Sequence, residues 1–351
     1  MAPDVLLYIV TGLALVLYAV LGGADFGAGV WQFNLAFRMP PEEQRFCDRS
    51  MGPIWETNHV WLIFVLVLLF SAFPTAFAAL SHALWLPFLL ALAGIVFRGC
   101  GFAFRHYAHG EEKVQQKWGV VFALSSTLTP FFLGASAGAV ASGQLHVTPS
   151  GGFEGNYYTD WISFLSIYTG FFSVGVCAYL AAVFLCRDAL REGNPVWIAT
   201  WRIRALRMGV TVGTLALAGL VVVAIDAPLL SESLHGGALG LVFLSVAAGM
   251  FSLLALYRHW FNLATAGAAV TVAAVIGGWA FGQYPAIIPP VITLHAAAAP
   301  DNVLWIFITA AGIGALFLVP SLLLLFWVFK GQNTETGLPT EQGDSHLTDE
   351  G

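Results

Sequence analysis

The chain has 351 residues, of which 58% are hydrophobic and only 10% are charged, and its formal net charge is −6. A soluble domain carries about 25% charged residues, so this chain cannot cover a globular surface with solvated side chains. The composition excludes a secreted domain, a soluble enzyme and a nucleic-acid binder, and it indicates a polytopic membrane protein.

Nine apolar runs are long enough to cross a bilayer as a helix, which takes about 20 residues. Only helices and closed barrels satisfy backbone polar groups in lipid, and runs this long and continuous exclude a barrel. We therefore expect an all-α integral membrane fold. The predicted spans are Val5–Phe33, Pro53–Leu80, Ala83–Phe104, Trp118–Val140, Trp161–Leu185, Leu206–Ile225, Ala238–Tyr257, Phe261–Phe281 and Val303–Phe329.

The two ends of the chain differ in character. The first apolar run is too long for the h-region of a signal peptide and has no basic residue before it, so we expect a retained first span. Residues 331–351 are polar, with five acidic residues and no Lys or Arg, and we expect a disordered tail after a membrane domain over residues 1–330. The four cysteines show no CxxC spacing, and we interpret them as free thiols.

The basic residues give the predicted orientation of the spans. All fourteen lie on one side of the predicted bundle, and the loops on the other side (residues 141–160, 226–237 and 282–302) contain none. By the positive-inside rule the basic side is cytoplasmic. The N-terminus is therefore expected to be periplasmic (outside) and the C-terminus cytoplasmic.

Asp25 is the first candidate functional residue, because an ionisable group inside a membrane span is a functional candidate by default. Gly22 and Gly29 lie three and four residues away on the same helix face, so a neighbouring helix could approach the carboxylate closely. The alternative is that Asp25 lies near the cytoplasmic boundary and binds only a backbone amide or water.

Glu56 is the second candidate. It lies in the first turn of the second span, after Pro53, where an acid is favoured by the helix dipole and can be merely a cap. Against that interpretation, Glu56 and His59 share a helix face and the polar Asn58 lies beside them. A buried carboxyl–imidazole pair can pass protons, because burial and mutual charge move both pKa values towards neutrality.

Other positions give weaker indications. His82 could ligate a haem iron, although a hydrogen bond is the simpler interpretation. Arg202, Arg204 and Arg207 are expected to face anionic lipid headgroups. The segment Gln283–Pro290, apolar and rich in proline, is expected to lie along the membrane surface or against a partner. Too few histidines lie within the spans to hold haems of the chain's own, and no metal site is predicted.

Several segments resemble subunit II of the cytochrome bd-type quinol oxidases. The most specific is the Trp-acid-x-Asn-x-Val-Trp run that opens the second span and includes Trp55 and Trp61. The resemblance covers roughly Leu6 to Lys330. The segments that carry it are Gly22–Gly29, Gly52–Leu62, Phe70–Pro74, Gly94–Gly99 and Gln283–Pro285.

The resemblance implies a bacterial inner-membrane complex that oxidises quinol and reduces dioxygen to water with protons taken from the cytoplasm. It implies nine helices arranged as two four-helix bundles plus one peripheral helix. The partner, subunit I, would hold the quinol site, the b-type haems and a haem d or third haem b. This chain would be haem-free, with either no cofactor or a structural quinone, and would contact lipids, quinone and in some members a one-helix accessory subunit.

The resemblance also implies that Asp25 and Glu56 belong to a proton route, with His59 and Asn58 beside them. Many members have Asp where this chain has Glu56, which leaves the hydrogen-bond geometry at that position open. Two other interpretations stand beside this one. The chain could be a secondary transporter with Asp25 and Glu56 as its ion site, although no matching pair occurs in the second half. It could also be a structural anchor in which both acids are caps.

Overall fold

The computed structural model describes residues 2–34, 39–51, 55–107 and 112–331. The predicted acidic tail therefore lies outside the described residues, apart from Gly331. The chain divides into two compact units, residues 1–309 and residues 310–351, and each is treated by itself.

Most described residues of the first unit are helical, and most predicted spans appear as single helices. The elements are α1 (Pro3–Leu17), the π-helical turn η1 (Tyr18–Gly22), α2 (Gly23–Asn34), α3 (Pro41–Met51), α4 (Trp55–Ala72), α5 (Pro74–Ala83), α6 (Trp85–Tyr107), α7 (Glu112–Ser142), α8 (Phe164–Arg191), α9 (Pro195–Asp226), α10 (Pro228–His235), α11 (Leu239–Tyr257), α12 (Phe261–Gln283), β1 (Ala286–Ile288), β2 (Ile292–Thr293), α13 (Leu294–Ala297) and α14 (Asp301–Gly331).

Within the described residues, eight helices are long and apolar enough to cross a membrane, or nine if one sharply bent pair counts as a span. The all-α membrane fold expected from the sequence is confirmed. The sixth predicted span begins earlier than expected, because Asn194 caps the helix with its side chain and Pro195 occupies the first position.

The second predicted span, Pro53–Leu80, is not one continuous helix. Residues Asn58–Ala72 and Pro74–Ala83 form two helices bent by 117°. Pro74 has no backbone N–H and restricts the residue before it, and Phe73 has the non-helical dihedrals φ −131° and ψ 59°. The apolar composition of the run concealed this break.

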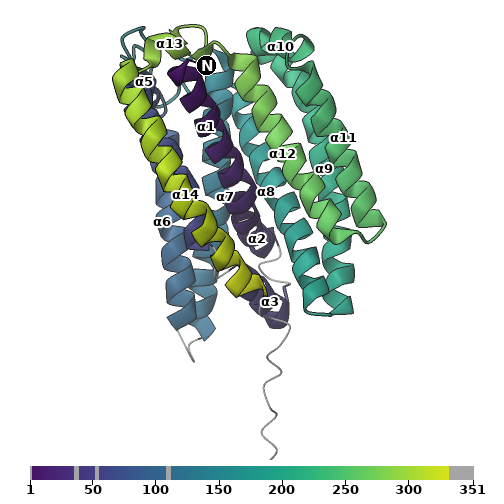
Figure 1. Ribbon diagram of the computed structural model, residues 1–351. Coiled ribbons are helices and arrows are strands. Elements are labelled where there is room, and N and C mark those ends of the chain that lie inside the picture. Colours follow the sequence, from purple (N-terminus) through teal and green to yellow (C-terminus); the bar gives the residue numbers. More distant parts are fainter. Residues whose placement is uncertain (1, 35–38, 52–54, 108–111, 332–351) are drawn as a thin grey trace, which may run out of the picture. The chain divides into compact units, whose positions relative to one another are not determined.

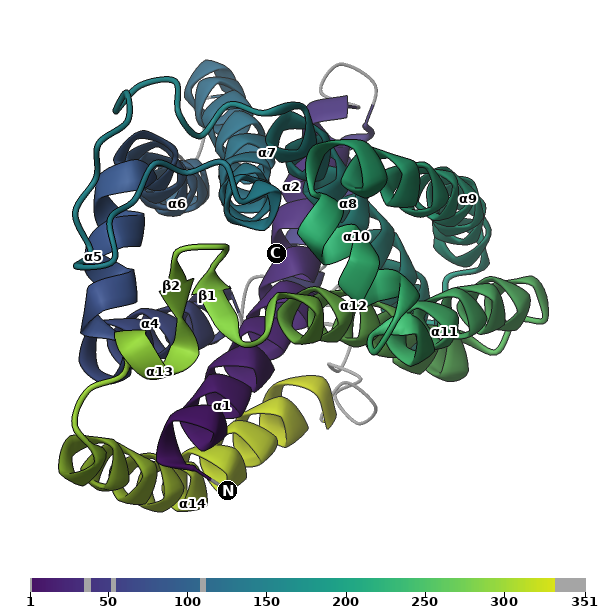
Figure 2. The ribbon, with the colours of Figure 1, turned by 90° about the horizontal axis from the view of Figure 1, so that it is seen from above.

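Helix α8 lies at the centre of the first unit and is its most buried span. It packs against α2, α7, α9 and α12 (Figures 1 and 2). On one side, α9, α11 and α12 complete a group of four with α8. On the other, α6 packs on α7, α7 packs on α2, and α1 packs on α4. Helix α8 also packs against α2 and α7, so the two sets of spans are in contact, and the division into two four-helix bundles plus one peripheral helix stays a prediction from the resemblance.

A short antiparallel hairpin of β1 and β2 lies at the end of the first unit where α1 begins (Figure 2). Ile288 and Ile292 are fully buried there among apolar side chains of α4 and α5 and of Phe73, which lies between these two helices. Part of the segment Gln283–Pro290 thus packs into the core of the chain itself, while Tyr284 and Pro290 are exposed, and its position along the membrane surface or on a partner stays a prediction.

Helix α14 crosses the boundary between the units: Asp301–Thr309 belongs to the first and Ala310–Gly331 to the second. In the second unit the large apolar side chains Ile313, Leu316, Phe317 and Leu323 are exposed. Such a surface is suited to lipid or to another membrane protein.

Candidate functional site

Asp25 occupies the first turn of α2, directly after the π-helical turn η1. A π-helical turn inserts an extra residue and often marks a functional site within a helix. The Asp25 residue is only 3% exposed within the chain. It is therefore a buried carboxylate within the long apolar helical run Pro3–Phe33.

Asn58 of α4 and Arg98 of α6 are the polar neighbours of Asp25. The Asn58 Nδ2 donates a hydrogen bond to Asp25 Oδ2, and it lies 3.4 Å from the Leu21 carbonyl oxygen. The Asp25 carboxylate also acts electrostatically on the Arg98 guanidinium. Asn58 and Arg98 are 3% and 2% exposed, so the opposite charges of Asp25 and Arg98 compensate each other inside the bundle.

Aromatic rings enclose this polar group. The Arg98 guanidinium carbon lies 4.7 Å from the centroid of the Phe26 ring, a cation–π distance. The His59 ring packs edge-on against Tyr18 and Phe26, with centroid distances of 6.2 and 5.9 Å. Among the described residues, the Tyr18 hydroxyl has no hydrogen-bond partner although it is buried. The rings exclude bulk water and leave one hydroxyl able to bind an internal water molecule.

The glycines around Asp25 bring neighbouring helices close to α2. A Cβ atom on Gly27 would lie 1.8 Å from the Cys177 carbonyl oxygen of α8, and one on Gly29 would lie 2.2 Å from Ser126 Oγ of α7. Gly22 differs from the sequence interpretation, because its nearest atoms belong to Tyr18 of the same turn. The approach of other helices thus occurs at Gly27 and Gly29.

The side chains of Trp55 and Glu56 lie outside the described residues, although their backbone forms the first turn of α4. The predicted pairing of the Glu56 carboxyl with His59 therefore lies outside the described residues. Trp61, the second tryptophan of the same motif, is partly buried and packs on the cluster that contains Tyr18 and Phe26.

The structure assigns new surroundings to Arg98, which sequence reasoning treated only as a marker of the cytoplasmic side, and to Arg202 and Arg204, which it expected to face lipid headgroups. Arg98 is the buried counter-charge of Asp25, and its position inside a predicted span was the available signal. Arg204 pairs with Glu43 of α3 and lies 4.5 Å from the Trp201 ring. Arg202 donates to the Leu256 and Tyr257 carbonyl oxygens at the end of α11. Arg202 and Arg204 therefore do not simply face lipid headgroups, whereas Arg207 is exposed.

His82 is exposed on α5, far along the chain from the polar group around Asp25. Among the described residues, no group of three or more His, Cys, Asp or Glu side chains is arranged to hold a metal ion. The described chemistry of the site is therefore that of a carboxylate, an amide, a guanidinium and an imidazole.

The sequence profile described as "Cytochrome bd terminal oxidase subunit II" matches residues 3–329 of this chain. The chain belongs to the cytochrome bd terminal oxidase subunit II family. It is accordingly a multi-span helical protein of the bacterial inner membrane, and the secondary-transporter interpretation is set aside.

Two named relatives and one solved structure support this membership. The chain is 28% identical over 222 residues to "Cytochrome bd-I ubiquinol oxidase subunit 2" of Escherichia coli (strain K12), which covers 61% of this chain and 55% of the relative. It is 31% identical over 127 residues to "Cytochrome bd ubiquinol oxidase subunit 2" of Bacillus subtilis (strain 168), covering 36% of this chain and 37% of the relative. The aligned parts thus span about half the length of the relative from E. coli and less of the other.

The fold matches a chain of "The structure of bd oxidase from Geobacillus thermodenitrificans" with a TM-score of 0.80 and 22% sequence identity. That match covers 95% of this chain and 100% of the other. At this identity the similarity shows a shared fold, and the roles of individual residues have to be argued from the site itself.

Proposed function

We propose that this chain is subunit II of a bd-type quinol oxidase, which couples the oxidation of a membrane quinol to the reduction of dioxygen to water. Two relatives are named as subunits of ubiquinol oxidases, and the family profile covers nearly the whole chain. In this proposal the haem-bearing subunit I holds the b-type haems, the haem d or third haem b, and the quinol site.

This chain is proposed to be haem-free. A b-type haem needs an imidazole directed at its iron, and the two histidines considered from the sequence do not suit that task. His59 is packed edge-on between two rings, and His82 is exposed on a different helix. We therefore derive no electron-transfer step through this chain, and none through a structural quinone.

The proposed contribution of this chain to turnover is the delivery of cytoplasmic protons through Asp25. The observation that carries the proposal is the Asp25 carboxylate, buried in a membrane span, bonded to Asn58 and compensated by Arg98. A carboxylate can accept and release a proton, and Asn58 and His59 can hold the water that brings it. Glu56, two residues before Asn58 on α4, is proposed to serve the same route.

Replacing the two acids tests this function in the purified two-subunit complex. Asp25→Asn and Glu56→Gln each remove the titratable group and keep its size, and each should slow quinol-driven oxygen consumption by about tenfold or more. The haem absorption spectrum, recorded on the same samples, reports whether the complex has assembled. Asp4→Asn is the matched control, because Asp4 is a buried carboxylate at the opposite end of the same span.

Wild-type turnover in both Asp25→Asn and Glu56→Gln, with haem content intact, would contradict the proton route. Equal slowing in Asp4→Asn would show that any buried acid of the first span matters only for stability.

A further inference from the structure

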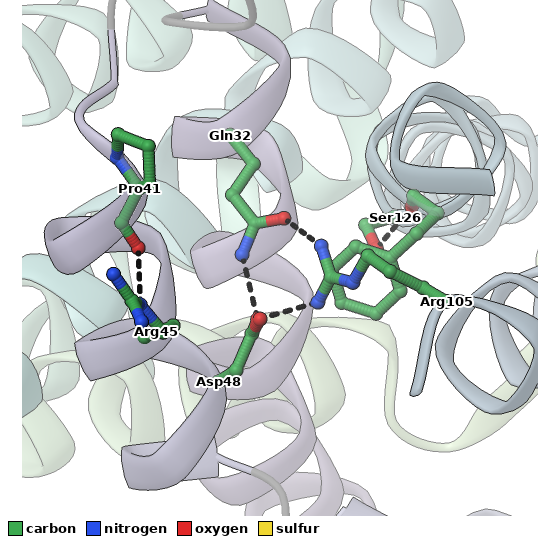
Figure 3. A network of polar contacts seen from close by, with 7 residues as sticks. Gln32, Pro41, Arg45, Asp48, Arg105 and Ser126 are labelled. Atoms are coloured by element: carbon green, nitrogen blue, oxygen red, sulfur yellow. Dashed lines mark hydrogen bonds and ion pairs between the residues drawn. The ribbon is translucent and has the colours of Figure 1, made fainter. Parts of the chain in front are cut away.

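A second polar group lies further along α2, where Gln32 meets α3 and α6 (Figure 3). Arg105 Nη1 donates to Gln32 Oε1 at 2.9 Å, and Gln32 Nε2 donates to Asp48 Oδ1 at 3.1 Å. Arg105 Nη2 also pairs with that Asp48 oxygen. The side chains of Arg105 and Asp48 are 9% and 30% exposed, so Asp48 is a carboxylate that water reaches from outside the bundle.

This group repeats the arrangement around Asp25 two helical turns away. Gln32 follows Asp25 by seven residues on α2, and Arg105 follows Arg98 by seven residues on α6. Seven residues of helix rise about 10.5 Å, and both pairs remain on one face of their helices. The two layers are therefore stacked along the same side of α2, at successive depths.

Side chains of α7 lie between the two layers. The Phe122 ring centroid is 5.4 Å from the Arg98 guanidinium carbon and 4.9 Å from that of Arg105. Ser126, fully buried one turn further on, packs against Gly29, which lies midway between Asp25 and Gln32. A side chain on Gly29 would collide with Ser126 Oγ, so glycine at this position allows a hydroxyl to reach α2 between the layers.

We call the polar side chains that run from Asp48 past Ser126 to Asp25 the column. We infer that Asp48, held by Arg105 and Gln32, is the point at which protons enter this column. The inference rests on the proposed function and extends it to two further helices, α3 and α7. Asp48 takes a proton from the aqueous phase at the end of the bundle that the arginine distribution predicts to be cytoplasmic. The proton then moves, through water bound by Gln32 and Ser126, to the Asp25 carboxylate, and no electron transfer is involved. Phe122 separates the two guanidinium groups.

The same contacts could serve helix packing alone, so the test needs a control on the same helix. Glu43 also belongs to α3 and is also a carboxylate paired with an arginine, but its partner is Arg204 of α9, away from the column. Asp48→Asn and Glu43→Gln each remove one carboxylate from α3. Only the first removes the proposed acceptor.

Oxygen consumption by the purified complex, measured across a range of pH, distinguishes the two roles. Among the contacts of the described residues, Asp48 faces the charged Arg105 of α6 and the uncharged Gln32 of α2. Asp48→Asn should slow turnover by about tenfold at alkaline pH, where protons are scarce, and recover as the pH falls, because protons then reach Asp25 directly from water. Asp48→Glu should restore the wild-type profile, and Glu43→Gln should retain it.

Wild-type rates in Asp48→Asn at every pH would overturn the inference. A loss that is independent of pH and shared with Glu43→Gln would overturn it too, because docking of α3 would then explain the effect. If Asp25→Asn slows turnover while Asp48→Asn does not, only this uptake point fails. If Asp25→Asn, Glu56→Gln and Asp48→Asn all keep wild-type turnover, the proposed proton route fails with it.

Discussion

At the scale of single residues, the chain surrounds a buried charge with two kinds of partner, a carboxylate and aromatic rings. Arg98 is compensated by the Asp25 carboxylate, lies over the Phe26 ring and is closed off by Phe122. Removing one member of a buried pair leaves the other charge uncompensated, which is far more destabilising than removing both. The Asp25–Arg98 pair is therefore best examined by removing its members singly and together.

Asp25→Asn and Arg98→Leu should each destabilise the complex by about 3–5 kcal/mol, because each leaves an isolated buried charge. The double variant should recover much of that loss and still fail to restore turnover. Thermal unfolding of the detergent-solubilised complex measures the first effect, and oxygen consumption measures the second. Additive destabilisation in the double variant would show that the two side chains are not coupled.

Sequence reasoning proposed Asp25 and Asn58 as site residues, but it did not propose Arg98 as the counter-charge of Asp25. The acid could be found because a carboxylate within an apolar run is conspicuous and glycines flank it. Arg98 was missed because all fourteen basic residues lie on one predicted side and together indicate the orientation. Arg98 was counted among them, although it lies within a predicted span. An arginine near the end of a span can face the cytoplasmic side or can compensate a buried carboxylate. Its role depends on which helix packs beside it, and one sequence does not reveal that neighbour.

At the scale of elements, the short helix α3 is fastened on two sides. Asp48 pairs with Arg105 of α6, and Glu43 pairs with Arg204 of α9, so this one helix joins both groups of spans. Phe46 and Cys47 are fully buried between these attachments, and the Phe46 ring stacks on Trp197. Two ion pairs and an apolar face together hold α3 in one position.

The Cys47 thiol reports whether α3 is docked. Burial raises its pKa well above the ordinary value, and the nearby Asp48 and Glu43 charges add to that shift. Since the thiolate is the reactive form, iodoacetamide at pH 8 should modify Cys47 more than about tenfold more slowly than an exposed thiol. Arg204→Leu should accelerate the reaction by releasing α3. Mass spectrometry of the alkylated peptide measures both rates, and fast labelling of the wild type would contradict the docked position.

Helices were predictable where a long apolar run is enough to indicate a span. They were mispredicted where a single residue breaks the helix within such a run. The long spans appear at their predicted places, although some helices extend well beyond the predicted bounds, as α9 does at its start. The break at Phe73 and the buried hairpin after Gln283 were missed. Hydrophobicity indicates that a segment is buried, but it does not indicate the direction in which the backbone runs. Pro74 was the local signal for the break.

At the scale of the whole molecule, sidedness remains a prediction drawn from the arginines and lysines. Single cysteines at two exposed polar positions would test it. Ser150→Cys, in the basic-free segment after α7, should react with a membrane-impermeant maleimide in spheroplasts. Gln116→Cys, near the start of α7, should react only after the membrane is permeabilised. The reverse pattern would invert the assignment and with it the side from which protons are taken up.

The break in the second span has a consequence for how the chain is made. The Ala72 carbonyl oxygen, at the end of α4, accepts a hydrogen bond of 2.9 Å from the Ala299 backbone N–H, just before α14. A ribosome completes the second span early, but this partner emerges only after nearly all the rest of the chain has been synthesised. Throughout that interval the Ala72 carbonyl oxygen needs another hydrogen-bond donor, from water or from the insertion machinery, because lipid offers no hydrogen bond. The second span thus reaches its final form among the last, although it is one of the first to be synthesised.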